Sequence, residues 1–155
     1  MPASEDSLLN ELRALYARAD TLFAGAHCEV STECCRFGIT GREPQVTSVE
    51  LALVARAVAA RGGPLPEKRR ALPLAPAKAR DERTCPMLDT RGRCSIYEAR
   101  PLGCRTFFCA RADVPAPPSR RELKNLVRAL QELASRHRPD GDKARAFTAA
   151  LRPPR

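Results

Sequence analysis

The sequence of 155 residues contains no tryptophan, and aromatic residues make up only 5% of it. No stretch approaches the roughly 20 consecutive apolar residues that a membrane-spanning helix needs. The core must therefore be built mainly from leucine, alanine and valine, which makes it thin for a chain of this length. We expect a soluble, cytoplasmic protein with one domain over residues 1–155.

Short motifs that mark common sites are also absent. The chain has no His-Glu pair or paired carboxylates that would indicate an acid–base pocket, so no residue is predicted to be catalytic. It has no C-x2-C knuckle either, and such knuckles usually carry the ligands of zinc ribbons and fingers. This absence argues against a standard zinc-binding nucleic-acid module.

The chain does contain seven cysteines, all in its middle part between Cys28 and Cys109. Thiolates are soft ligands that hold zinc and iron–sulfur clusters. Disulfides are disfavoured because the count is odd, because Cys34 and Cys35 are adjacent, and because the first residues are acidic and polar rather than signal-like. The cysteines therefore predict a metal site.

The cysteines form two clusters that are roughly 50 residues apart in the sequence. The predicted metal ligands are Cys28, Cys34 and Cys35 in the first cluster and Cys85, Cys94, Cys104 and Cys109 in the second. Spacings of five, eight, nine and four residues suit long loops that converge on one centre. Zinc and an iron–sulfur cluster stay open as alternatives, since both accept tetrahedral thiolate sets. His27 is an alternative nitrogen ligand, although a histidine at a loop edge more often faces solvent.

The second cluster carries the elements Cys85-Pro-Met-Leu, Cys94-Ser-Ile-Tyr, Arg100-Pro, Cys104-Arg and Cys109 in that order. The pattern resembles the YkgJ-type cysteine-cluster family, a zinc- or iron-chelating domain whose early group reads C-x2-C-x2-C-C. In that early group Ser31 stands where the family has its second cysteine. The resemblance implies metal binding over about residues 27–110. Related clusters in a flagellin lysine methylase make a redox or methyl-transfer role conceivable.

Hydrophobic periodicity predicts a mainly α fold, with a few helices that frame an irregular cysteine-rich metal-binding centre. The expected helices cover residues 4–24, 47–62 and most of a C-terminal helical segment at 119–151, which a proline-glycine break divides. Capping boxes begin two of them, one at Thr47 and one at Ser119. Residues 29–45 and 85–109 are predicted to be irregular, and 64–79 a proline-rich connecting arm.

The formal net charge is +9. Basic residues attract nucleic acid in general, yet here they are spread along the chain and no aromatic residues interleave with them. We therefore favour a metal-binding protein with a redox or metal-handling role. The alternatives are a cluster-dependent enzyme and a zinc-stabilised basic nucleic-acid-binding protein.

Side chains around the second cluster are expected to support the site. Tyr97 and Arg100 should pack and form hydrogen bonds around the loop, or alternatively donate to thiolate sulfur. Phe107 and Phe108 should shield the site from water.

Overall fold

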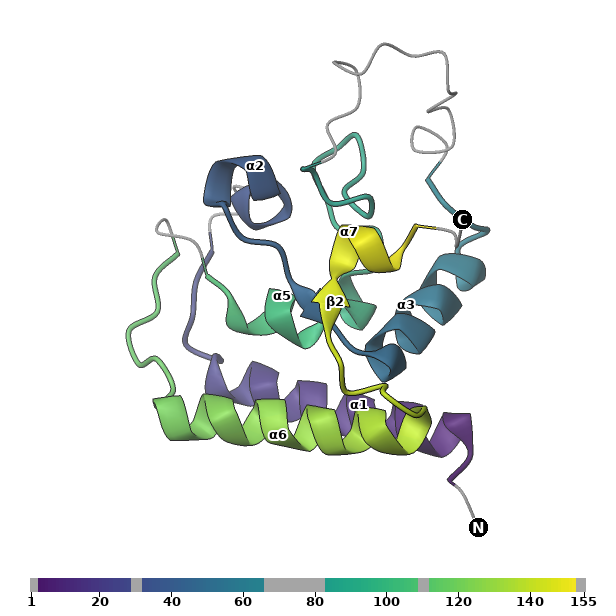
Figure 1. Cartoon of the computed structure of the whole chain (residues 1–155). Coiled ribbons are helices and arrows are strands. Elements are labelled where there is room, and N and C mark those ends of the chain that lie inside the picture. The colour runs from purple at the N-terminus through teal and green to yellow at the C-terminus, as the bar shows by residue number, and fades with distance from the viewer. Residues whose placement is uncertain (1–2, 29–31, 66–82, 109–111, 153–155) are drawn as a thin grey trace.

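The computed structural model describes residues 3–28, 32–65, 83–108 and 112–152. Its frame is a pair of long helices, α1 (Glu5–Leu22) and α6 (Arg120–His137), which lie side by side and run antiparallel (Figure 1). A third helix, α3 (Ser48–Ala60), packs against both. The predicted mainly α fold is confirmed. All but the first two residues of the predicted arm at 64–79 lie outside the described residues.

The long helices pair because each presents one apolar stripe. Leu8, Leu12 and Leu15 of α1 are at most 5% exposed, at the spacing that places them on one helix face. On α6, Leu126, Leu130 and Leu133 form the matching stripe. Both predicted capping boxes are present, at Thr47 for α3 and at Ser119 for α6. The helices are therefore set by local sequence signals and fixed by burial of their stripes.

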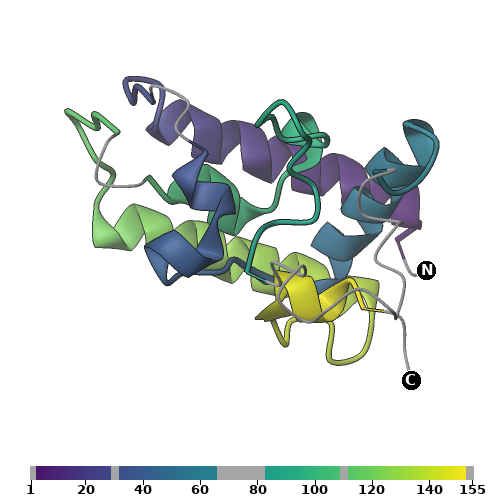
Figure 2. The ribbon, with the colours of Figure 1, turned by 90° about the horizontal axis from the view of Figure 1, so that it is seen from above.

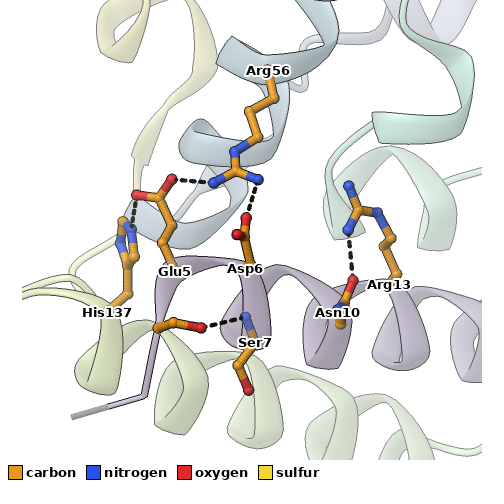
Figure 3. Close-up of polar contacts among 8 residues, drawn as sticks. Glu5, Asp6, Ser7, Asn10, Arg13, Arg56 and His137 are labelled. Atoms are coloured by element: carbon orange, nitrogen blue, oxygen red, sulfur yellow. Dashed lines mark hydrogen bonds and ion pairs between the residues drawn. The ribbon is translucent and has the colours of Figure 1, made fainter.

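Charged groups join the ends of the three helices. Arg56 of α3 reaches Glu5 and Asp6 in the first turn of α1, with 2.8 Å between its Nη2 and Glu5 Oε1 (Figure 3). His137, at the end of α6, lies with its Nε2 atom 3.5 Å from the other oxygen of Glu5 (Figure 3). Its Nδ1 atom forms a hydrogen bond of 2.9 Å with Ser48 Oγ. The contacts confirm that the start of α1 meets the end of α6.

Short elements lie above this frame and correct two predictions. The stretch predicted as a loop over 29–45 contains a 3-10 turn, η1 (Glu33–Cys35), and a short helix, α2 (Phe37–Thr40). A two-residue strand, β1 (Gln45–Val46), pairs antiparallel with β2 (Arg145–Ala146). In the predicted C-terminal helical segment at 119–151, the part after the proline-glycine break is reduced to α7 (Phe147–Ala150), because Arg145 and Ala146 are used in that strand pairing. Phe147 is 1% exposed and anchors it.

The stretch predicted to be irregular over 85–109 contains a 3-10 turn, η3 (Tyr97–Ala99), and a short helix, α5 (Leu102–Thr106). Pro101 precedes α5, where its fixed backbone angle suits a helix start. α5 packs on α1, and in the view from above it lies between α1 and α6 (Figure 2). None of the helices in the described ranges is both long and apolar enough to cross a bilayer.

Candidate metal centre

The cysteines of both sequence clusters face one cavity, which we call the cysteine cavity. Its volume is about 1080 Å³, and its walls include Cys28, Cys34, Cys35, Cys85, Cys94 and Cys104. Cys28 follows α1, Cys34 and Cys35 lie in η1, and Cys104 lies in α5. The seventh predicted ligand, Cys109, and the substituted position Ser31 lie outside the described residues.

Backbone hydrogen bonds close the long sequence gap between the clusters. The Cys85 N–H donates to the Cys35 carbonyl at 2.7 Å, next to an isolated bridge between Arg36 and Thr84. Cys94 is held in turn by a bridge to Leu88, two residues after Pro86. Main-chain pairing, which does not depend on side-chain type, therefore carries the two cysteine loops to the same place.

The sulfur atoms of Cys34 and Cys35 lie 3.9 Å apart. A hydrogen bond from Cys35 lowers the pKa of Cys34 to about 6, and the same bond raises the pKa of Cys35. Within the described ranges, no three His, Cys, Asp or Glu side chains come close enough together to hold a metal ion. The cysteines share a cavity, but the described part does not form a closed ligand set.

Burial disfavours ionisation of the deeper thiols. It raises the pKa of Cys104 and of Cys94, and negative charge on Cys85 and Cys34 raises the pKa of Cys104 further. Several thiolates in one partly buried cavity repel one another, so they ionise together only if positive charge is supplied. A bound cation supplies that charge, and protons leave when it binds.

Arg100 provides a fixed positive charge at the cavity. Its guanidinium stacks on the Tyr97 ring, with 3.7 Å from Cζ to the ring centroid. Its positive charge lowers the pKa of Cys34, and at Cys94 it opposes the larger effect of burial, which raises the pKa. In the described part of the chain, its Nη1 atom is buried and has no hydrogen-bond partner. The Ser95 hydroxyl, beside Cys94, is buried and unpartnered in the same way. Within the described ranges, the Arg100 donor at the cavity is thus left unused, a costly arrangement unless a ligand accepts from it.

Glu50 anchors the short helix that carries Cys104. This carboxylate is fully buried, and it accepts the Leu102 N–H at 2.8 Å, the Thr47 N–H at 2.8 Å and the Tyr16 hydroxyl at 3.3 Å. Burial raises its pKa. The capping box predicts only the Thr47 contact. The bond to Leu102 joins residues 52 positions apart, and no local sequence pattern indicates it.

Arg105, next to Cys104, fixes the other side of the loop. Its side chain is 4% exposed and forms an ion pair with Asp20 at 2.7 Å. It also donates to the carbonyls of Arg100 and Glu98, and it stacks over the Tyr16 ring at 4.2 Å. The sequence resemblance covers Cys104-Arg as a pair, and the structure supplies the reason, since this arginine ties the cysteine loop to α1.

The remaining candidate residues lie at the rim. His27 is exposed, and its backbone pairs with Asp113 at 2.7 and 2.8 Å, which ties the first cysteine loop to the segment before α6. Phe107 and Phe108 both line the cavity and are half-buried. Phe108 packs on Phe23 with 4.9 Å between ring centroids. These rings cover part of the cavity wall, as expected for residues that limit access of water.

A helical frame around a thiol-lined cavity defines a cysteine-rich metal-chelating class of protein. Residues 27–126, more than half of the chain, match the CxxCxxCC family, described as "Putative zinc- or iron-chelating domain". The chain belongs to this family. No curated protein and no solved structure matches it. Family membership assigns metal chelation to this part of the chain and leaves zinc and iron as alternatives.

Proposed function

We propose that this protein binds zinc or an iron–sulfur cluster through the thiolates of its seven cysteines and serves as a redox or metal-handling module. The observation that carries this proposal is the buried Nη1 of Arg100 at the thiol-lined cavity, which has no hydrogen-bond partner among the described residues. Neutral thiols do not require a half-buried cation beside them. A metal–thiolate centre does, because four thiolates around a divalent metal leave a net negative charge.

The donor set fits either metal. Zinc and iron both take sulfur ligands, and when bound the group supplies either a structural cross-link or an electron-transfer centre. Arg100, which lines the cavity, would then donate a hydrogen bond to sulfur and stabilise the ionised thiolates. Glu50 and Arg105 hold the helix and loop that present Cys104. No catalytic residue is proposed.

The separation of the described cysteines predicts that binding tightens the fold. Because cysteines of both sequence clusters line one cavity, a metal held by both would cross-link loops that are far apart in the sequence. A ligand that binds the folded chain and not the unfolded one raises stability by mass action. Removal of the metal should therefore lower the melting temperature and loosen the loops at Cys34 and Cys94.

The first experiment is purification without oxygen and without chelator, followed by metal and sulfide analysis and an absorption spectrum. Absorption near about 400 nm with bound iron and sulfide identifies an iron–sulfur protein, and a colourless sample with stoichiometric zinc identifies a zinc protein. Serine substitution of Cys85, Cys94 or Cys104 should lower metal content, whereas Glu132→Ala on the exposed side of α6 should not. A wild-type protein without either metal contradicts the proposal.

A second experiment tests the role of Arg100. Arg100→Met removes the charge beside the thiols, and Arg91→Met removes an exposed charge from the same loop as a matched control. Release of metal to a coloured chelator should be faster in Arg100→Met than in the control. Equal release rates in the two variants would show that the Arg100 guanidinium does not stabilise the bound metal.

A further inference from the structure

The first half of α6 carries a dense group of cations on one side, which we call the basic face. It consists of Arg120, Arg121, Lys124 and Arg128, all exposed, and together with Asn125 they border a shallow depression of about 480 Å³. Arg120, Lys124 and Arg128 follow one another at intervals of four residues. At about 1.5 Å per residue they form a line of charge roughly 12 Å long.

Unlike Arg56 and Arg136, these four side chains have no acidic partner among the described residues. Arg56 pairs with Glu5 and Asp6, and Arg136 at the far end of α6 pairs with Glu11. In the described ranges, none of the four forms an ion pair with a carboxylate. Glu122, which lies in the same turn, is already engaged, because its carboxylate accepts the Ser119 N–H at 2.7 Å and the Ser119 hydroxyl at 2.9 Å.

The arrangement is unfavourable for the isolated helix. Cations near a helix N-terminus oppose the helix dipole, and like charges four residues apart repel each other. Arg120 and Arg121 are in the first turn, and Lys124 has Arg120 and Arg128 as its neighbours at that spacing. An anionic partner removes both penalties at once. The position of these cations is therefore better explained by binding than by folding.

We propose that the basic face binds the phosphate backbone of double-stranded nucleic acid. Each strand of a duplex presents one phosphate charge per about 3.4 Å of helix axis, so a rigid line of cations can contact several phosphates. The apolar stripe of α6 is buried against α1, and Val127 is the single large apolar side chain of α6 that is exposed, which is too little to insert into a lipid surface. The four cations and Asn125 include no aromatic anchor for a protein partner and no ring for stacking on single-strand bases.

The structure supports the nucleic-acid alternative more strongly than the sequence does. In the sequence, Arg120 and Arg121 form one short basic cluster among scattered arginines. Helical spacing brings Lys124 and Arg128 to the same side as that pair, which concentrates the charge. Recognition through phosphates alone predicts binding that does not depend on base sequence and that weakens steeply with salt. This inference does not depend on which metal the cysteine cavity holds.

The test is a titration of a fluorescent duplex DNA of about 20 base pairs with the full-length protein. Fluorescence anisotropy measures the binding affinity at several salt concentrations. Four phosphate contacts predict a slope of log affinity against log salt of about −3.6, that is, a loss on the order of 100-fold between about 50 and about 200 mM salt. Replacing all four cations of the basic face by glutamine should abolish most of that slope.

The matched control replaces four exposed arginines elsewhere by glutamine, namely Arg18, Arg91, Arg138 and Arg145, and so removes the same charge. Circular dichroism of both variants verifies that they fold. Retention of affinity by the control and its loss in the basic-face variant supports the proposal. No duplex binding at low salt, equal losses in the two variants, or tighter binding to polyglutamate, anionic vesicles or single-stranded DNA of equal length overturns it.

Discussion

Glu50→Ala is the substitution that most directly tests how the fold supports the cysteine cavity. The Glu50 carboxylate is fully buried and accepts hydrogen bonds from donors in three parts of the chain, at Tyr16, Thr47 and Leu102. Truncation leaves these donors unsatisfied around a new cavity. Because Leu102 begins α5, the helix that carries Cys104 loses its attachment to α3.

The expected loss in the free energy of unfolding is about 3 kcal/mol. Each buried donor left without a partner costs about 1–3 kcal/mol, but water that enters the truncated site and the removal of a buried charge offset part of the sum. Against a typical total of about 5–15 kcal/mol, this loss is large. It corresponds to a fall in melting temperature of roughly 6–12 °C for a chain of this size.

The assay is urea unfolding followed by circular dichroism, with chelator and reductant present so that all variants are compared without metal. The denaturant midpoint should fall while the m-value stays constant. Glu50→Gln, which keeps one acceptor oxygen, should lose less, and Glu132→Ala, at an exposed position of α6, should stay within about 0.5 kcal/mol of wild type. A loss in Glu50→Ala no larger than in Glu132→Ala would refute the role of Glu50 as a link between α1, α3 and α5.

Three further outcomes are expected. Arg105→Met should lower the free energy of unfolding by about 2–4 kcal/mol in the same urea assay, because it removes the ion pair with Asp20 and leaves two carbonyls without a donor; a loss below about 1 kcal/mol contradicts this. Gly141→Ala should destabilise the fold by about 2 kcal/mol or more, because the added Cβ would lie 2.3 Å from a backbone oxygen of α6. Gly25→Ala should be tolerated, because its added Cβ meets nothing closer than 3.9 Å. Equal denaturant midpoints in these two variants would refute the packing argument. Burial raises the pKa of Glu50 above its ordinary value of 4.5, so the folded state holds this proton more tightly than the unfolded chain, and stability should fall as pH rises from about 4.5 through the folded pKa. The difference in unfolding free energy between wild type and Glu50→Gln isolates this contribution, and a difference that does not change with pH contradicts it.

Local signals account for the parts of the fold that sequence reasoning predicted correctly. Leucines spaced by three and four residues predict α1 and α6, and the capping boxes at Thr47 and Ser119 mark helix starts, because these effects depend only on neighbours along the chain. Elements such as α2 and α5 were not predicted, since four or five residues are too few to establish a period. Their formation depends on contacts made elsewhere in the chain, such as Glu50 with Leu102.

The sequence by itself determined the chemistry of this protein, because thiol ligands, helix periodicity and capping residues are properties of residue type and near spacing. It thereby specified a mainly helical metal-chelating chain. Only the tertiary structure decided that Cys35 and Cys85 meet through a backbone hydrogen bond and that Arg100, among the residues described, leaves a donor unpaired beside the thiols. Only in the folded chain do Glu50 and Arg105 hold the helix that carries Cys104 from both sides. These contacts join positions up to 85 residues apart, and such pairs are set by how the helices pack rather than by any pattern along the chain.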